Sequence, residues 1–164
     1  MKHELPEELQ YLDNWYDEDY CLEAVKNNGY ELKYIKSQTP EICLAAVKNY
    51  AYALKYVKIQ TPEICLAAVK QDGDVLKYVK ERTIEICLEA VKQNGISLQY
   101  INFQTPEICL AAVKQDGEST AYVKEQTLEI ILAALEDYPN SIKFIDWNIL
   151  TEDEFEYIKL KYLN

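Results

Sequence analysis

The chain has 164 residues, with 28 acidic and 17 basic side chains and a formal net charge of -11. Apolar residues make up 49% and charged residues 27%, which is typical of a folded globular protein rather than a disordered or membrane-spanning one. The acidic excess argues against duplex nucleic acid as the main partner, and only four glycines make a Gly-rich phosphate loop or a β-sandwich unexpected.

The N-terminal residues carry no recognisable targeting signal. Residues 1–15 are acidic and lack the basic and apolar regions of a signal peptide. No stretch of the sequence approaches the ~18 uninterrupted apolar residues that span a bilayer, so no membrane partner is expected. Residues 1–16 are expected to form an N-terminal cap. Its apolar residues would pack on the first repeat: Leu5, Leu9, Leu12 and Trp15.

From residue 17 onward the sequence repeats every 22 residues. The decapeptide TPEICLAAVK occurs unchanged at 39–48, 61–70 and 105–114, and related decapeptides begin at residues 17, 83 and 127. Six repeats therefore cover residues 17–148 without a gap, and positions within each repeat are called places 1 to 22. Such a period indicates an architecture in which each repeat packs on its neighbours.

Each repeat is predicted to form two short helices. In the third repeat, Thr61 is a suitable N-cap and Pro62 suits the first helical position. Gly73 at place 13 is expected to adopt the left-handed conformation that ends a helix. A second helix is expected over residues 74–81.

Two repeats lack the glycine of place 13. Ala51 and Pro139 stand there in the second and sixth repeats, which are therefore expected to turn differently.

The pattern of apolar residues predicts how the helices pack. The first helix is apolar on almost every side, which is typical of a helix buried on several sides. The second helix places Leu76, Tyr78 and Val79 on one face at about 100° per residue. Leucine-rich repeats have a similar length, but their strand signature is absent. We predict an all-α fold, an α-solenoid of six stacked 22-residue helical hairpins with capping helices at both ends.

The predicted solenoid is a single domain over residues 1–164. Its C-terminal cap would occupy residues 149–164, with Thr151 as the N-cap of a closing helix. That helix would carry three apolar residues on one side: Phe155, Ile158 and Leu163.

The repeat resembles a known family. Its pattern EICLAAVKQ-x-G-x-x-L-x-Y-V/I-K is similar to a short tandem repeat classed as a domain of unknown function, abundant in giant DNA viruses and also found in bacteria. The resemblance covers about residues 17–148 and implies no chemistry and no catalytic residues. The sixth repeat is the least typical, with Pro139 in place of Gly and Ile131 in place of Cys.

The five cysteines all stand at place 5 of successive repeats, which raises the question of disulfides or a metal. Equivalent helices in a stack lie ~8–10 Å apart, too far for a disulfide or for a shared zinc ion. We therefore expect buried cysteines, no metal and no cofactor. The only histidine, His3, has no partner fixed by the repeat, so no catalytic residue and no enzyme activity are expected.

Two further rows recur in the repeats. Aromatic residues at place 18 form either a stacking ladder for a ligand or a structural row: Tyr34, Tyr56, Tyr78, Tyr100, Tyr122 and Phe144. Lysines at places 17 and 20 of the first three repeats form either a basic stripe for a polyanion or acidic peptide, or a solvated face. In the second interpretation they would pair with Glu41, Glu63 and Glu85.

The places at which the repeats differ supply the candidate binding residues. Places 14, 17 and 21 are expected to lie on one exposed stripe of the second helix, and they carry apolar side chains in repeats two, four and six. Exposed apolar side chains on an acidic protein mark an interaction surface or have drifted without constraint. The candidate residues are Tyr30, Tyr52, Lys55, Ile59, Lys77, Ile96 and Phe103.

These observations favour a non-enzymatic protein-interaction scaffold. It would bind a protein or peptide partner through the exposed face of the second helix of each hairpin. The alternative is an acidic decoy or polyanion-competitor that engages a basic host or bacterial factor. The expected location is the cytoplasm, and the host cytoplasm if the protein is viral.

Overall fold

The fold is an all-α repeat solenoid. A computed structural model describes residues 15–163, and the predicted contacts of Leu5, Leu9 and Leu12 lie outside the described residues. The α-helices are α2 (Glu18–Asn27), α3 (Pro40–Asn49), α4 (Pro62–Val69), α5 (Ile84–Gln93), α6 (Pro106–Gln115), α7 (Leu128–Asp137) and α8 (Glu152–Tyr162). The 3₁₀ helices are η1 (Gly29–Tyr34), η2 (Ala51–Tyr56), η3 (Gly73–Tyr78), η4 (Gly95–Tyr100), η5 (Gly117–Tyr122), η6 (Pro139–Phe144) and η7 (Trp147–Ile149).

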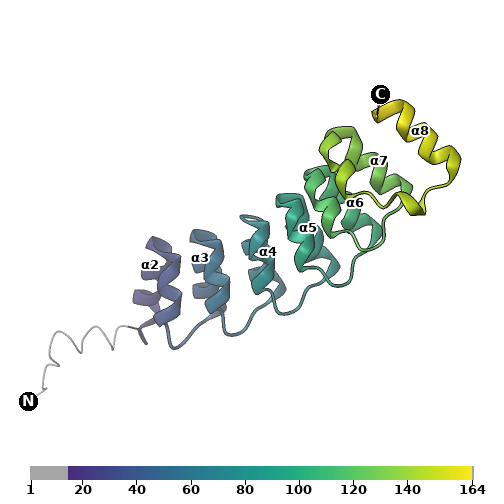
Figure 1. Ribbon diagram of the computed structural model, residues 1–164. Helices are drawn as coiled ribbons and strands as arrows, with labels where there is room; N and C mark the ends of the chain where they lie inside the picture. Colours follow the sequence, from purple (N-terminus) through teal and green to yellow (C-terminus); the bar gives the residue numbers. More distant parts are fainter. Residues whose placement is uncertain (1–14, 164) are drawn as a thin grey trace, which may run out of the picture. The chain divides into compact units, whose positions relative to one another are not determined.

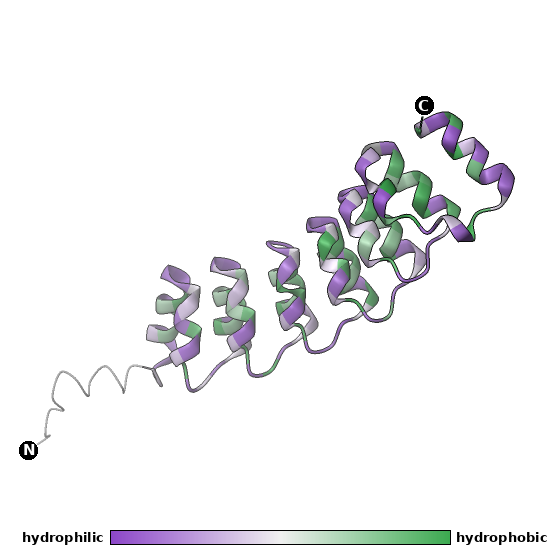
Figure 2. Ribbon diagram, in the orientation of Figure 1, coloured by the Kyte–Doolittle hydropathy of each residue, from purple (hydrophilic) through white to green (hydrophobic). Residues whose placement is uncertain are grey.

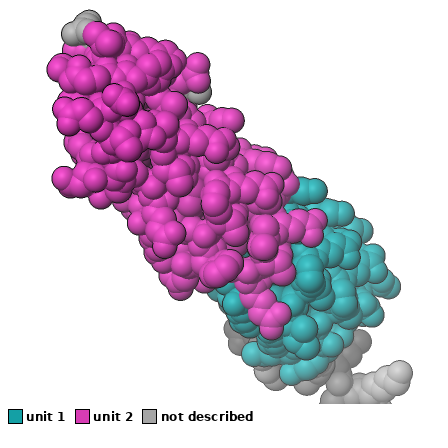
Figure 3. Space-filling model, turned by 90° about the vertical axis from the view of Figure 1, so that its right-hand side faces the viewer, with its two compact units in different colours: residues 1–71, 78–80 teal, residues 72–77, 81–164 magenta. Residues whose placement is uncertain are grey.

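The chain divides into two compact units, which Figure 3 shows in different colours. Unit 1 comprises Met1–Gln71 and Tyr78–Lys80, and unit 2 comprises Asp72–Lys77 and Glu81–Asn164. In unit 1, α3 packs between α2 and α4; in unit 2, α6 packs between α5 and α7, and α8 contacts α7 (Figure 1). None of the helices in the described range is long and apolar enough to cross a membrane.

The first helix of each repeat begins where the sequence predicted. The hydroxyl of Thr61 accepts a hydrogen bond from the amide of Ile64 at 3.3 Å, and Pro62 occupies the first helical position. Thr39, Thr83, Thr105 and Thr127 cap their helices in the same way. The capping prediction is confirmed because it depends only on local chemistry.

The second helix differs from the prediction. It is a 3₁₀ helix of six residues over places 13 to 18, and it ends at Tyr78 rather than Glu81. Residues three apart eclipse in a 3₁₀ helix, so places 13 and 16 face inward while places 14 and 17 share the outer face. Leu76 is fully buried, and Val79, which we had placed on the helix, is buried just after it.

The glycines of place 13 also differ from the prediction. None of the glycines adopts a positive φ, so they do not form left-handed helix ends. Each is instead packed tightly against the following repeat. A Cβ on Gly29 would overlap the carbonyl oxygen of Ala46, and a Cβ on Gly95 would overlap that of Ala112. Glycine is therefore required by the close approach of two backbones.

Ala51 changes the neighbouring repeat rather than its own. The residue before it, Tyr50, has φ -145° and ψ 104°, close to the values of Asn28 in repeat 1, so the second repeat turns normally. In the following repeat, α4 contacts η2 and ends two places early at Val69. Its last turn is tightened, with the amide of Gln71 donating to the carbonyl of Ala68. The Cβ of Ala51 thus accompanies a shortened facing helix.

The C-terminal cap follows the prediction in most respects. Thr151 and Glu154 form a capping box at the start of α8. Ile158 is fully buried in a cluster with Ile131, Leu135 and Ile145, and Figure 2 shows a long apolar run in α7. Leu163, which was expected on the packed side, is 38% exposed because it lies beyond the end of α8.

Candidate functional site

Unit 1 carries a continuous surface of tyrosine and lysine side chains. It is built from places 14, 17 and 18 of the first two repeats, and we call it the Tyr–Lys strip: Tyr30, Lys33 and Tyr34 on η1, and Tyr52, Lys55 and Tyr56 on η2. The centroids of the Tyr30 and Tyr56 rings lie 5.5 Å apart in an edge-to-face contact. Tyr50 stacks on Tyr52 at 5.7 Å and also contacts Tyr30, so the rings form a network across the two repeats.

Both lysines of the strip lie against tyrosine rings. The ammonium nitrogen of Lys33 is 3.8 Å from the ring centroid of Tyr30 and 4.3 Å from that of Tyr34. The ammonium nitrogen of Lys55 is 4.7 Å from the centroid of Tyr56 and 5.8 Å from that of Tyr30. Tyr30 is thus flanked by two cations, an arrangement favoured by the negative face of an aromatic ring.

The electrostatics of the strip follow from these contacts. A hydrogen bond with Tyr56, together with a hydrogen bond and the positive charge of Lys33, lowers the pKa of Tyr30. Hydrogen bonds to tyrosine hydroxyls raise the pKa of Lys33 and of Lys55. Both lysines are therefore fully charged at neutral pH.

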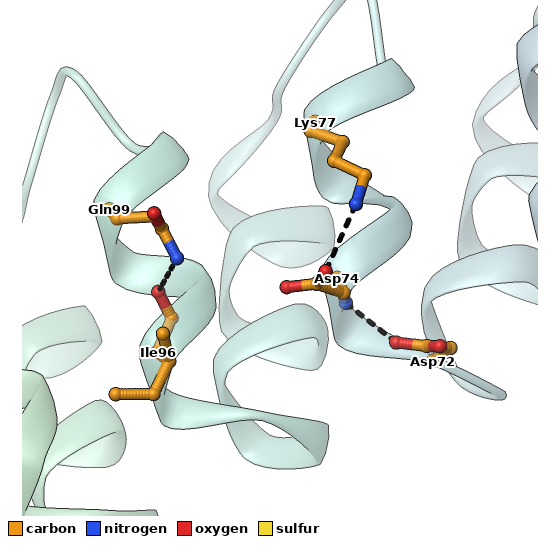
Figure 4. A network of polar contacts seen from close by, with 5 residues as sticks. All are labelled: Asp72, Asp74, Lys77, Ile96 and Gln99. Atoms are coloured by element: carbon orange, nitrogen blue, oxygen red, sulfur yellow. Dashed lines mark hydrogen bonds and ion pairs between the residues drawn. The ribbon is translucent and has the colours of Figure 1, made fainter.

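The corresponding places of repeats 3 and 4 in unit 2 are occupied differently (Figure 4). Lys77 forms an ion pair with Asp74 at 3.0 Å, and Asp74 donates its backbone amide to the side chain of Asp72. In the next repeat, the amide of Gln99 donates to the carbonyl of Ile96 at 3.2 Å. Both polar side chains are satisfied within their own 3₁₀ helix.

The predicted stripe of places 14, 17 and 21 is only partly correct. Places 14 and 17 do share a face, but place 21 lies in the loop after the helix, because the helix already ends at place 18. Ile59 and Phe103 at place 21 are the most exposed large apolar side chains among the described residues, at 82% and 79%. Ile59 borders a cavity of about 270 Å³ that includes Gln38 and Cys43. Phe103 borders an equivalent cavity of about 260 Å³ in unit 2.

The seven candidate residues therefore fall into three groups. Tyr30, Tyr52 and Lys55 lie together in the Tyr–Lys strip, while Ile59 and Phe103 project from loops. The remaining two, Lys77 and Ile96, are only half-exposed in unit 2.

The recurring residues of the 22-residue repeat are characteristic of a protein family. A protein-family profile described as "Domain of unknown function (DUF4116)" matches four overlapping windows, residues 17–60, 39–83, 61–105 and 83–127. The chain belongs to this family. The windows cover repeats 1 to 5, so the DUF4116 match stops where the least typical repeat begins. No curated protein matches the chain, and no solved structure matches it.

A glutamine at place 22, which the sequence analysis missed, joins consecutive DUF4116 repeats. The side chain of Gln60 donates to the carbonyl of Tyr78 and accepts from the amide of Lys80 at 3.0 Å. It also donates to the carbonyl of Leu54 in its own repeat. We call this arrangement the glutamine clamp, and it recurs at Gln38, Gln104 and Gln126. The recurrence of glutamine just before the Thr cap is the signal that could have revealed it.

The lysines of place 20 have a structural role as well. Lys58 donates its ammonium group to the carbonyl of Lys36, and Lys80 donates to the carbonyl of Lys58 at 3.0 Å. They lie beyond the 3₁₀ helix, so they do not share a helical face with the lysines of place 17. No ion pair within residues 15–163 joins either row to Glu41, Glu63 or Glu85.

All five cysteines are buried, as predicted. Burial raises the pKa of the Cys43 thiol from 9.0 to about 11, and burial also raises the pKa of Cys21, Cys87 and Cys109. The Cys43 thiol donates to the side chain of Gln38 at 3.7 Å. Within the described residues, no group of three or more His, Cys, Asp or Glu side chains is placed to hold a metal ion.

We expect these thiols to react slowly with Ellman's reagent at pH 8 in the native protein, and rapidly in denaturant, because the neutral thiol is a poor nucleophile. A folded pKa above the unfolded one means that the unfolded chain releases its thiol protons first. The contribution of the buried thiol of Cys43 to the free energy of unfolding should therefore be constant below about pH 9 and should be lost as the pH rises from about 9 to 11. Rapid labelling of all five native thiols would contradict this.

Proposed function

We propose that this chain is a non-enzymatic scaffold that binds a protein or peptide partner. The observation that carries the proposal is the set of large apolar and aromatic side chains that are exposed to solvent. Ile59 and Phe103 are the most exposed of them among the described residues. Tyrosine-rich and apolar surface of this kind is enriched in protein interfaces and supplies their strongest contacts. The surface lies on short helices and loops, and within each unit the glutamine clamp holds them to the following repeat, so little ordering would accompany binding.

The absence of an enzyme activity belongs to this proposal. The only histidine of the sequence is His3, which lies outside the described residues. The cysteines, the other candidate nucleophiles, are buried, and burial raises the pKa of four of them, Cys21, Cys43, Cys87 and Cys109. The DUF4116 match adds no chemistry.

The proposal predicts that Ile59→Asp combined with Phe103→Asp abolishes capture of partner proteins from lysate of the native host, measured by mass spectrometry. A charged side chain in a desolvated contact disfavours binding. The fold tolerates an acid at place 21, since Glu81 and Glu125 already stand there, so circular dichroism should not change.

Leu160→Asp is the matched control for this experiment. Leu160 is a 70% exposed leucine on α8, outside the 3₁₀ helices and the loops of place 21. Its replacement should leave the captured proteins unchanged. If the double variant captures the same proteins as the natural chain, the proposed surface is wrong.

The acidic decoy is a second candidate because of the net charge of -11. The two candidates differ in their salt dependence. A complex held by charge should weaken steeply between about 0.1 and 0.5 M salt, whereas an apolar contact should weaken much less.

A further inference from the structure

We propose that the Tyr–Lys strip binds an acidic peptide segment in extended conformation, with carboxylates of the peptide seated on the ammonium groups of Lys33 and Lys55. The inference rests on the proposed function and specifies the class of partner. It is carried by a difference between neighbouring repeats. The lysine at place 17 of repeat 3 forms an ion pair, whereas the lysines at place 17 of repeats 1 and 2 form none with the residues that the structure describes.

The residue at place 14 differs between repeat 3 and the two repeats before it. In repeat 3, Asp74 stands at place 14 and forms an ion pair with Lys77 at place 17 (Figure 4). In repeats 1 and 2, place 14 is Tyr30 or Tyr52, and the lysine at place 17 lies over tyrosine rings instead. The geometry of the helix is the same, so the change from Asp to Tyr removes a carboxylate that would otherwise neutralise the lysine.

The helices η1 and η2 supply no carboxylate that pairs with these two lysines. The only acidic residue of η1 is Glu31, and its carboxylate accepts a hydrogen bond from Asn28 at 3.0 Å. The helix η2 contains no acidic residue. Within residues 15–163, Lys33 and Lys55 take part in no ion pair. This is notable in a chain with 28 acidic residues against 17 basic ones.

The two ammonium groups of the Tyr–Lys strip lie close enough together for one extended peptide to reach both. The ammonium groups of Lys33 and Lys55 lie 3.8 and 5.8 Å from the ring centroid of Tyr30, on adjacent repeats. An extended chain rises about 3.3 Å per residue and its side chains alternate between two faces, so carboxylates two residues apart lie on one side of the peptide and can face two such cations. The exposed ring of Tyr30 between them offers an apolar contact to the intervening residue. A peptide of the form Asp/Glu-x-Asp/Glu fits this arrangement.

The test uses a library of random dodecapeptides, selected for binding to the full chain and, separately, to a Tyr30→Asp, Tyr52→Asp variant. This variant copies the arrangement of repeat 3 and supplies each lysine with an internal carboxylate. We expect the natural chain to enrich peptides with two carboxylates two residues apart, and the variant not to enrich them.

The best peptide is then labelled and its affinity measured by fluorescence anisotropy. Affinity should fall by roughly tenfold or more with Lys33→Gln plus Lys55→Gln, because two charge-assisted contacts are lost. It should also fall when the peptide's Glu residues become Gln. Lys26→Gln is the matched control: Lys26 is on α2 and is paired with Glu23, so affinity should change by less than about twofold.

Several results would overturn the inference. These are the absence of any enriched peptide, enrichment without acidic residues, and binding that the two lysine substitutions leave unchanged. Displacement of the peptide at lower concentration by oligo-dT, or by a peptide copying residues 1–14, would identify a different occupant. If the Ile59 and Phe103 substitutions still abolish partner capture in these cases, the proposed function stands and only the acidic peptide is wrong.

Discussion

Replacing Gly95 with alanine is expected to destabilise the protein by about 2–3 kcal/mol. The new Cβ would overlap the carbonyl oxygen of Ala112 in the next repeat. The backbones at Gly95 and Ala112 cannot easily move apart, because the amide of Gly95 also donates a hydrogen bond to the side chain of Gln115. Urea unfolding followed by circular dichroism would measure the loss.

Ala51→Gly is the matched comparison at the same place of repeat 2. It removes a Cβ to which the facing helix α4 is already adjusted. Removing the Cβ should change the free energy of unfolding by no more than about 1 kcal/mol. If Gly95→Ala is as mild as Ala51→Gly, the glycines are not required by close backbone contact.

Replacing Gln104 with alanine is expected to lower the free energy of unfolding by about 2–3 kcal/mol, because one side chain makes several hydrogen bonds. Its amide donates to the carbonyl of Tyr122 at 2.8 Å, and its carbonyl oxygen accepts from the amide of Lys124 at 3.0 Å. The thiol of Cys109 also donates to it. The loss should appear as a lower urea midpoint. Gln104→Glu should also destabilise, because a carboxylate cannot donate to the Tyr122 carbonyl.

Arg82 allows the same interaction to be tested by gain. It stands at place 22 of repeat 3, but its guanidinium donates to the carbonyls of Leu76 and Lys77 in its own repeat. Arg82→Gln should restore a clamp to repeat 4 and raise the free energy of unfolding by about 1 kcal/mol. A neutral or negative result, together with a mild effect of Gln104→Ala, would show that the glutamine clamp contributes little.

The features that depend on local chemistry could be predicted from the sequence. The 22-residue period, the Thr and Pro at the helix starts and the burial of the cysteines all follow from residues within one repeat. The period together with the helix-capping residues and the apolar pattern also predicted an all-α solenoid, because a short repeat buries its apolar face only against its neighbours.

The features that depend on the next repeat could not be predicted. At the end of the second helix, the side chain of Gln60 from the preceding repeat binds the carbonyl of Tyr78 and the amide of Lys80. The glycines were recognised, but their cause is a carbonyl from a neighbouring helix rather than a turn. The expectation of a longer second helix also misplaced part of the candidate site. Because the 3₁₀ helix η2 ends at Tyr56, Ile59 does not share a helical face with Tyr52 and Lys55.

The way the repeats are joined has a consequence for how such an array evolves. The glutamine clamp and the lysines of place 20 bind main-chain carbonyl and amide groups, which every residue type except proline provides. A duplicated segment of 22 residues would thus meet compatible groups on both sides, whatever its variable side chains. Lengthening by internal duplication and diversification of the outer face are separable, so new recognition properties can arise without redesign of the joints.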